Sequence, residues 1–416
     1  MNLFWYTQIT RLLLPLFFLR LWWRGRHQPD YRLHWSERLG FYPQRRDPRP
    51  LIWVHAVSVG ETRAALPLLH ALHRRYPDHA LLLTHTTPTG RATAIDDMPD
   101  GVLRVYLPYD LPGAVGSFLD TFCPSQGLLL ETELWPRLIR ECRQRRVPLS
   151  LVNARLSERS ARRYALFPIL TRNMLQQLTL IATQSPADAE RFRALGAPTA
   201  PVMGNLKFDA IPSAQHNQNV AHLGALIGQG RRVWIAASTR EGEEQWLLER
   251  VHGQLTPPNL LVLVPRHPQR FDAVARLLDE RNLAYQRRSA EQPVSPATAV
   301  LLGDSMGEMN AWYQWARFAL MGGTLLPVGG QNLLEPLSVG CPVLIGPHTY
   351  NFAAAAEGAL SHGAARRVSM DDLPDVIPAL LDQPDLCHSM GQKGLAWVDQ
   401  ERGATERLMG LLANVV

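Results

Sequence analysis

An acidic residue stands in the first half of the chain at a place where anions usually bind. Glu61 follows the apolar run LIWVHAV (51–57) and opens an amphipathic helical pattern over residues 61–76. A helix that begins after a strand presents free backbone N–H groups, which attract an anion. Glu61 therefore has two interpretations. It compensates the helix dipole, with Thr62 as the N-cap, or it is a general base kept ionised by the helix start.

A second acidic cluster ends another apolar run. In ETELWP (131–136), Glu131 and Glu133 flank Thr132, so they would point to opposite sides of an extended stretch. We therefore expect only one of them to face a ligand, while Pro136 fits the first turn of the next helix. Two acids at an apolar strand end are uncommon as pure structure, which favours a functional role over a structural one.

Lys207, in GNLKFD (204–209), is one of only two lysines among 43 lysine and arginine residues. A lysine ammonium is compact, whereas an arginine guanidinium is a planar fork, and the two are not interchangeable. The retained lysine indicates a site that needs a compact cation. An ordinary surface lysine is the alternative.

The second half of the chain carries residues suited to binding an anion. The run NLLVLVP (259–265) ends in Pro265 and is followed by Arg266, which could hold a phosphate with its forked N–H groups. His267 is either a ligand contact or a structural histidine. Beyond the next apolar run, backbone amides near Met306 and Gly307 would open a helix and hold an anion.

A glycine-rich loop, GGTLLPVGGQNLLEP (322–336), runs into a further helix. Asn332 and Glu335 are three residues apart and hence on one helical face. A carboxylate in that position would suit the hydroxyls of a ribose. Glycine-rich loops alone are weak indicators, so a structural turn remains the alternative.

Several common catalytic motifs are missing from the sequence. There is no G-x-G-x-x-G after the first strand and no G-x-x-x-x-G-K-[ST], which argues against a dinucleotide dehydrogenase and a P-loop enzyme. Neither a D-x-D suited to a metal–diphosphate bridge nor a G-x-S-x-G is present. We therefore expect chemistry that uses no metal and no cofactor.

The candidate residues follow apolar runs that alternate with helical patterns. Continuous apolar runs of strand length between amphipathic helices indicate parallel sheets covered on both faces. A polar stretch at 211–224 predicts a linker between two such lobes. The expected fold is therefore α/β, with two Rossmann-like parallel-sheet lobes and a central cleft, since ligands bind beyond the carboxyl ends of such strands.

The N-terminal segment, residues 1–24, is apolar and aromatic but is interrupted by Arg11 and Arg20. A spanning helix needs roughly 20 mainly apolar residues, so the segment is borderline. The aromatic and basic edge over residues 22–26 is typical of a membrane interface, and its positive charge favours keeping the body in the cytoplasm. We expect a membrane anchor that either spans the bilayer or lies in its surface. A first helix packed on the body is the alternative.

Charge and cysteine usage agree with a cytosolic protein that binds anions. The formal net charge is +6 and the pI is about 9.3, which suits phosphates, acidic sugars or an anionic membrane surface, although a basic soluble protein would look the same. The four cysteines are scattered and form no C-x-x-C pair, which is typical of a reducing compartment. We expect no nucleic-acid partner.

Taken in order, these motifs resemble those of one family. They are HAVSVGET (55–62), THTTPTG (84–90), YLPYDLP (106–112), ETELWP (131–136), NARLS (153–157), GNLKFD (204–209), STREGEE (238–244), VPRHPQR (264–270), GDSMGEM (303–309), GGQNLLEP (329–336) and GPHTYNF (346–352). The series resembles the 3-deoxy-D-manno-octulosonic acid (Kdo) transferases of Gram-negative bacteria. It runs over nearly the whole chain, which is far more specific than any single motif.

The resemblance implies a GT-B glycosyltransferase that inverts the anomeric centre without a metal. The implied domains are an anchor (1–24), an acceptor-binding lobe (25–212), a donor-binding lobe (225–395) and a C-terminal helix (396–416) that returns to the first lobe. The implied donor is CMP-Kdo and the acceptor is the lipid A precursor lipid IVA. The chain resembles the type that adds two Kdo residues, at the cytoplasmic face of the inner membrane.

The resemblance also assigns roles to residues. Glu61 would be the catalytic base, and Glu131 and Lys207 would support the transition state. The implied CMP-Kdo contacts are Pro265, Arg266, Met306, Gly307, Glu308, Asn332, Leu333, Leu334 and Glu335. The chain has Gly330-Gln331-Asn332 where some members have Gly-His-Asn, and Leu333 where a proline follows.

Two other functions remain open at this point. One is a soluble nucleotide-sugar 2-epimerase of the same architecture, which would use a UDP donor and need no anchor. The other is a non-enzymatic, membrane-tethered nucleotide-sugar binder. Membrane association, CMP rather than UDP binding, and a transfer assay separate the three.

Overall fold

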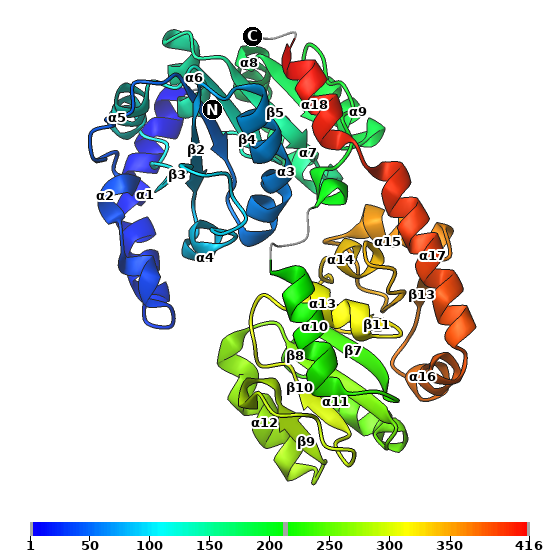
Figure 1. Cartoon of the computed structure of the whole chain (residues 1–416). Helices are drawn as coiled ribbons and strands as arrows, with labels where there is room; N and C mark the ends of the chain where they lie inside the picture. Colours follow the sequence, from blue (N-terminus) through cyan, green and yellow to red (C-terminus); the bar gives the residue numbers. More distant parts are fainter. Residues whose placement is uncertain (1–2, 211–214, 414–416) are drawn as a thin grey trace. The chain divides into compact units, whose positions relative to one another are not determined.

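The computed structural model describes residues 3–210 and 215–413 and divides the chain into two compact units (Figure 1). Unit 1 comprises Met1–Ile211 and Glu401–Val416, and unit 2 comprises Pro212–Gln400. Each unit is built on one sheet whose paired strands all run parallel. The prediction of two Rossmann-like parallel-sheet lobes is therefore confirmed.

The sheet of unit 1 has the order β3-β2-β1-β4-β5-β6. Its strands are β1 (Leu51–His55), β2 (Ala80–His85), β3 (Leu103–Tyr106), β4 (Gln126–Leu130), β5 (Leu149–Ala154) and β6 (Leu180–Thr183). The chain first builds outward from β1 through β2 to β3 and then returns to the other side of β1 with β4. The carboxyl ends of β1 and β4 therefore border the topological switch point, where such sheets bind ligands.

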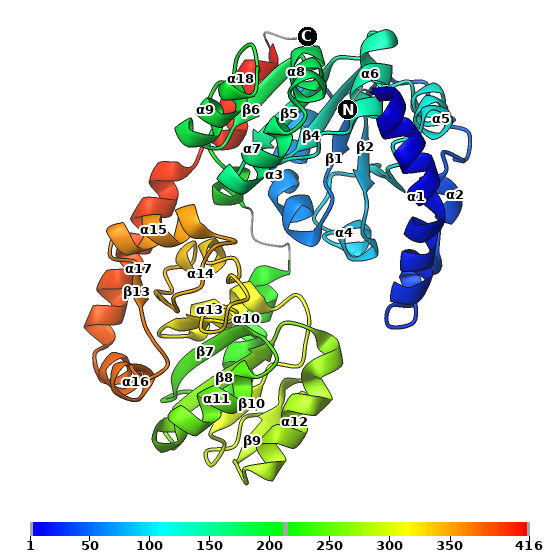
Figure 2. The same cartoon turned by 180° about the vertical axis from the view of Figure 1, so that it is seen from behind.

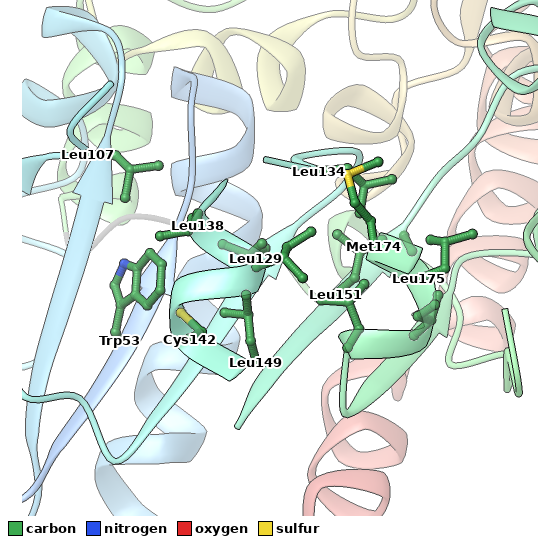
Figure 3. Close-up of a cluster of buried hydrophobic side chains, with 14 of the residues drawn as sticks. Trp53, Leu107, Leu129, Leu134, Leu138, Cys142, Leu149, Leu151, Met174 and Leu175 are labelled. Atoms are coloured by element: carbon green, nitrogen blue, oxygen red, sulfur yellow. The ribbon is translucent and has the colours of Figure 1, made fainter. Parts of the chain in front are cut away.

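Helices cover both faces of this sheet, which explains why its strands are continuously apolar. The helices of unit 1 are α1 (Leu3–Arg24), η1 (Pro29–Arg32), α2 (Trp35–Arg38), α3 (Val59–Arg75), α4 (Pro88–Ala92), α5 (Pro112–Phe122), α6 (Pro136–Gln144), α7 (Glu158–Ala165), α8 (Pro168–Gln177), α9 (Pro186–Ala194), η2 (Leu206–Asp209) and α18 (Ala404–Ala413). On one face, Trp53 and Leu129 of the sheet pack in one cluster with Leu138, Cys142 and Met174 of α6 and α8 (Figure 3). Residues of α3 and α18 form the core of the other face.

The C-terminal helix α18 belongs to unit 1, where it contacts α3, η2 and β6 (Figure 2). The Asp209 carboxylate accepts the backbone N–H groups of Gly403 (2.8 Å) and Thr405 (2.6 Å). The sequence interpretation placed one returning helix at 396–416. In the structure α17 (Pro384–Glu401) ends before Gly403, and the part of the chain assigned to unit 1 begins at Glu401. Residues 414–416 lie outside the described residues.

The sheet of unit 2 has the order β13-β12-β11-β7-β8-β10-β9, so its switch point lies between β7 and β11. The strands are β7 (Arg232–Thr239), β8 (Asn259–Pro265), β9 (Tyr285–Arg287), β10 (Val300–Leu302), β11 (Ala319–Met321), β12 (Val343–Ile345) and β13 (Ala365–Arg367). The helices are α10 (His216–Ile227), α11 (Glu243–Arg250), η3 (His252–Gln254), η4 (Pro268–Arg270), α12 (Phe271–Glu280), η5 (Arg288–Ala290), α13 (Met309–Trp315), α14 (Leu334–Leu337), α15 (Ala353–Ser361), α16 (Leu373–Asp382) and α17.

The prediction of a linker over residues 211–224 was wrong for most of this range, because most of it is helical. Residues 211–214 lie outside the described residues, but α10 begins at His216 and packs against α13 in unit 2. Leu223 and Leu226 are buried there, and the Trp315 indole N–H donates to the carbonyl of Val220 (2.8 Å). The first turn of this helix is polar, and for this reason the sequence analysis predicted a linker instead of a helix with one apolar face.

One side of helix α1 packs on the rest of unit 1, and its other side is exposed. Tyr6 hydrogen-bonds to the Asp110 carboxyl, Thr7 is buried, and Phe17 and Phe18 contact the ring of Tyr109. An exposed apolar stripe runs along the opposite side, formed by Trp5, Ile9, Leu12, Leu16, Leu19 and Trp23. Within residues 3–210 and 215–413, no helix combines the length and apolar character that crossing a membrane requires.

Candidate functional site

Glu61 is held in a capping box at the start of α3. Ser58 is the N-cap, and its Oγ accepts the Glu61 backbone N–H (3.4 Å). The Glu61 carboxylate turns back to accept the Val57 N–H (2.8 Å) and the Ser58 hydroxyl (3.0 Å). The expectation that Thr62 caps this helix was wrong, because α3 begins at Val59 and Thr62 is buried inside it.

The environment of Glu61 brings its pKa close to neutral. Burial, followed by the negative charge of Glu131, raises the pKa of Glu61 to about 7, while the Val57 N–H opposes the rise. Glu133 raises this pKa further and the Ser58 hydroxyl lowers it. The donors at the helix start do favour the ionised form of Glu61, as expected, but burial and repulsion outweigh them. A carboxylate with a pKa near the operating pH is well suited to general base catalysis.

Glu131 and Lys207 form an ion pair next to this carboxylate. Lys207 Nζ lies 2.7 Å from Glu131 Oε1, and the two side chains are 19% and 21% exposed. The Lys207 backbone is fixed by Asn205, whose side-chain oxygen accepts its N–H (3.0 Å). The compact ammonium thus meets a specific carboxylate rather than bulk water.

Glu131 and Glu133 have different partners, and the stretch that carries them is not extended, so the argument from strand alternation does not apply to it. Glu131 has a positive φ of 58°, and the chain after β4 is a turn rather than an extended stretch. Both carboxylates raise the pKa of Glu61. Glu133 Oε2 accepts the Trp135 indole N–H (2.9 Å) and lies 3.9 Å from His55 Nε2.

Sequence reasoning missed His55, the last residue of β1. It is fully buried, its Nδ1 lies 2.8 Å from Thr84 Oγ1, and its Nε2 has no hydrogen-bond partner among the described residues. Its Nε2 faces Glu133 from inside the sheet. A polar residue that closes an otherwise apolar strand was the signal that could have pointed to it.

In unit 2, the predicted anion contacts lie at strand ends. Pro265 closes β8, and the exposed Arg266 follows it, with its backbone N–H donated to the carbonyl of Thr239 (3.0 Å). Met306 and Gly307 (φ 83°) lie in the loop after β10 and do not open a helix as expected, because α13 begins at Met309 with Glu308 as its N-cap. Their backbone N–H groups and the Arg266 guanidinium are the groups here that suit a phosphate.

The Glu308 side chain is already occupied within unit 2. Its carboxylate is buried, lies 2.7 Å from Arg288 Nη2 and accepts the hydroxyl of Ser305. A ligand at this loop would therefore meet the backbone of Glu308 rather than its charge.

Asn332 and Glu335 lie together as predicted, but not on one helical face, because α14 begins at Leu334 and Asn332 precedes it. Asn332 Nδ2 donates to Glu335 Oε1 (3.2 Å), and Asn332 Oδ1 accepts the Leu334 N–H (3.2 Å) at the start of α14. Leu333 and Leu334 are buried, so their side chains belong to the core and only their backbone remains for a ligand.

Each predicted set thus gathers within its own unit. Glu61, Glu131, Glu133 and Lys207 lie beyond β1 and β4 at the switch point of unit 1. The predicted contacts of unit 2 follow β8, β10 and β11. In the parts of the chain that the structure describes, no three histidine, cysteine or acidic residues are grouped so as to hold a metal ion.

Solved structures share this fold. The UDP-GlcNAc 2-epimerase from Neisseria meningitidis, bound to UDP-GlcNAc, matches with a TM-score of 0.60 and 14% identity over 88% of this chain and 100% of that one. At this identity the likeness shows the fold alone. Together with the two parallel sheets, it places the chain in the class of α/β proteins with two Rossmann-like, GT-B-like lobes.

The sequence comparisons define the family. Residues 33–210 match the family model of the 3-deoxy-D-manno-octulosonic-acid transferases. The chain is 41% identical to the 3-deoxy-D-manno-octulosonic acid transferase of Bordetella pertussis, over 98% of both chains. It is 37% identical to the one of Haemophilus influenzae, over 98% of this chain and 97% of that one. The chain belongs to the Kdo transferase family and is a glycosyltransferase, which confirms the resemblance.

Proposed function

We propose that this glycosyltransferase moves Kdo from CMP-Kdo to the lipid A precursor lipid IVA in lipopolysaccharide inner-core synthesis, adding two Kdo residues. The family supports Kdo transfer. The observation that carries the mechanism is the half-buried Glu61 carboxyl at the switch point of unit 1, with a pKa of about 7. A base with this pKa can remove the proton of a sugar hydroxyl at neutral pH.

In the proposed reaction, unit 1 supplies the base and unit 2 holds the donor. Ionised Glu61 takes the proton of an acceptor hydroxyl while that oxygen attacks C2 of Kdo. The bond from C2 to the phosphate oxygen breaks, its electron pair stays with CMP, and the configuration at C2 is inverted. Lys207, fixed by Glu131, supports the transition state. Arg266 and the backbone N–H groups of Met306 and Gly307 stabilise the departing phosphate.

Substitution of Glu61 by glutamine tests this role. Glutamine has nearly the same shape and can still accept the Val57 N–H, so we expect Glu61→Gln to keep the fold and the affinity for CMP-Kdo. It cannot take a proton, so transfer should fall by about 10²–10⁴-fold. The measurement is mass spectrometry of the products formed from CMP-Kdo and lipid IVA, which also counts the Kdo residues added.

Glu158→Gln is the matched control, because Glu158 is an exposed glutamate on α7 in the same unit. It should transfer Kdo at the wild-type rate. Wild-type turnover by Glu61→Gln would refute the assignment of the base. A product with one added Kdo would refute only the number of transfers.

We also propose that helix α1 attaches the protein to the cytoplasmic face of the inner membrane. Its exposed apolar stripe has the width and spacing of a face buried in a lipid surface, and Arg24 and Arg26 at its end suit anionic headgroups. The lipid acceptor resides in such a surface, so attachment would keep unit 1 beside its substrate.

A further inference from the structure

Arg240 follows β7, beside the switch point of the unit 2 sheet, and connects three loops. Its Nη1 lies 2.8 Å from His267 Nε2 in the loop after β8. With the Gln331 amide oriented so that its oxygen faces Arg240, this oxygen accepts from Nη2 (3.0 Å) and Nε (3.2 Å). The guanidinium is thus held between the loops that follow β7, β8 and β11.

Both partners of this guanidinium are uncharged. Gln331 is a neutral amide. Partial burial and the neighbouring guanidinium groups of Arg240, Arg266 and Arg270 lower the pKa of His267, so its imidazole stays neutral at physiological pH. The guanidinium of Arg240 is therefore oriented by two uncharged hydrogen-bond partners.

The neighbouring Arg270 shows the contrast. Its Nη1 and Nη2 lie 2.5 and 2.9 Å from the two carboxylate oxygens of Glu244, which neutralise it. Across residues 3–210 and 215–413, no carboxylate oxygen lies within 4.0 Å of a side-chain nitrogen of Arg240 or Arg266. Two guanidinium groups without a direct ion pair therefore remain at the strand ends of unit 2, although the Glu243 carboxylate acts on Arg240 from a greater distance.

The backbone around Arg240 is fixed before any ligand arrives. The Glu243 carboxylate accepts the Arg240 N–H (2.9 Å) and the Gly323 N–H (2.7 Å), which ties the loops after β7 and β11 together. The two loops also pack closely, since a Cβ on Gly322 would lie 2.4 Å from the carbonyl oxygen of Ser238. A rigid loop reduces the entropy lost when a ligand is bound.

The remaining donors of Arg240 match a carboxylate. A guanidinium has five N–H groups. The contacts with His267 and Gln331 use one on each nitrogen, so one N–H is left on Nη1 and one on Nη2. Two N–H groups on adjacent nitrogens are the pair that binds both oxygens of a carboxylate.

The donor of the proposed reaction carries two anionic groups. One is the phosphate of the nucleotide, and the other is the carboxylate that makes the transferred sugar an octulosonic acid. We propose that Arg240 binds the sugar carboxylate while Arg266 takes the phosphate. This inference rests on the proposed function and makes Arg240 the residue that selects an acidic sugar.

The test compares two ligands in purified full-length protein. CMP carries only the phosphate, and CMP-Kdo carries both anions. We expect Arg240→Gln to raise the KM for CMP-Kdo by about tenfold or more, the usual effect of losing a charged hydrogen bond. Its affinity for CMP, measured by titration calorimetry, should change by less than about twofold, because CMP lacks the second anion. Arg266→Gln should lower the affinity for both ligands.

Further variants separate binding from folding. Arg240→Lys keeps the charge but not the fork, so its KM should lie between those of the wild type and Arg240→Gln. Gln331→Ala keeps the Arg240 guanidinium but removes one of the side chains that orient it. The KM of this variant for CMP-Kdo should therefore rise less than that of Arg240→Gln, and its affinity for CMP should not change. Arg250→Gln, at a partly exposed arginine of α11 that pairs with Asp371, is the matched control and should change neither value.

Several outcomes would overturn the inference. If Arg240→Gln weakens the binding of CMP as much as the binding of CMP-Kdo, Arg240 binds the phosphate and not the sugar carboxylate. If neither value changes, Arg240 does not contact the donor. A wild-type protein that binds CMP-Kdo but transfers nothing contradicts the proposed function alone, because direct binding of the two ligands still tests Arg240. A wild-type protein that binds neither ligand contradicts both.

Discussion

At the scale of single residues, the central feature is a carboxyl whose pKa is set by opposing effects. Glu61 sits at a helix start and accepts two hydrogen bonds, both of which favour ionisation. Burial and the carboxylate of Glu131 disfavour it more strongly, which brings the pKa of Glu61 to about 7. Lys207 pairs with Glu131 and so limits how far this repulsion can rise.

This pKa predicts how transfer depends on pH. A general base acts only when deprotonated, and the pKa of Glu61 is raised to about 7. We therefore expect kcat/KM for transfer to fall about tenfold per pH unit below 7 and to level off above it. Initial rates with CMP-Kdo and lipid IVA between pH 5 and 9 provide the measurement.

Glu131→Gln tests whether the negative charge of Glu131 is a cause of the raised pKa of Glu61. Because the negative charge of Glu131 raises the pKa of Glu61, its removal should move that pKa down. Carbon NMR of the labelled Glu61 carboxyl follows this titration even if transfer is lost. A titration of Glu61 that is unchanged in Glu131→Gln would show that Glu131 is not a cause of the shift.

At the scale of elements, α6 depends on a side chain from a distant loop. Its first turn has no side-chain cap of its own, and the Asp110 carboxylate accepts the Arg137 N–H (2.9 Å) and the Leu138 N–H (2.7 Å) instead. Burial raises the pKa of Asp110 to about 6, while these N–H groups oppose the rise. Asp110 also hydrogen-bonds Tyr6, so one carboxyl joins α1 and α6.

Asp110→Ala should therefore destabilise unit 1. It leaves one buried and one part-buried N–H group of α6 without an acceptor, at a cost of about 1–3 kcal/mol in the free energy of unfolding. Chemical denaturation at pH 7 measures this loss. Asp120→Ala is the control, because Asp120 is an exposed aspartate on α5 whose pairing with Arg145 contributes little. Equal stability of the two variants would contradict the capping role of Asp110.

At the scale of the whole molecule, the chain leaves unit 1 and returns to it. Asp209 lies near the end of the first segment of unit 1. Its carboxylate accepts the N–H groups of Gly403 and Thr405, which lie near the start of the second segment. Residues from both ends of the sequence therefore share the core that α3 and α18 build on one face of the sheet. The other molecule-wide feature is the exposed apolar stripe of α1, which unit 1 leaves uncovered.

The stripe predicts binding to lipid. We expect the protein to co-sediment with vesicles that contain anionic lipid, and a Leu12→Glu/Leu16→Glu variant to bind at least about tenfold less. Each exposed leucine would gain about 1.5–3 kcal/mol when buried in lipid. Leu386→Glu changes an exposed leucine of α17 in unit 2 and should bind as the wild type does. Undiminished vesicle binding by the α1 variant would contradict the proposed attachment.

The sequence by itself determined the parallel sheets and the chemical types at their carboxyl ends. Apolar periodicity reports burial on both faces, and the ordered motifs identify the family. Residues such as Glu61 and Arg266 could be selected because they follow apolar runs, and Lys207 because lysine is so rare in this chain. The closeness of Asn332 and Glu335 was predicted from their spacing, although Asn332 lies just before α14 rather than on its face.

Only the tertiary structure decided how these groups act on one another. The chain turns after β4 at Glu131, whose positive φ of 58° could not be predicted from the residue pattern. The pKa of Glu61 depends on burial and on Glu131, whose position relative to Glu61 is set by the pairing of β1 with β4. The three loops around Arg240 meet because β7 lies between β8 and β11 in the sheet. Electrostatic effects act through space, so they become readable only once the order of the strands is known.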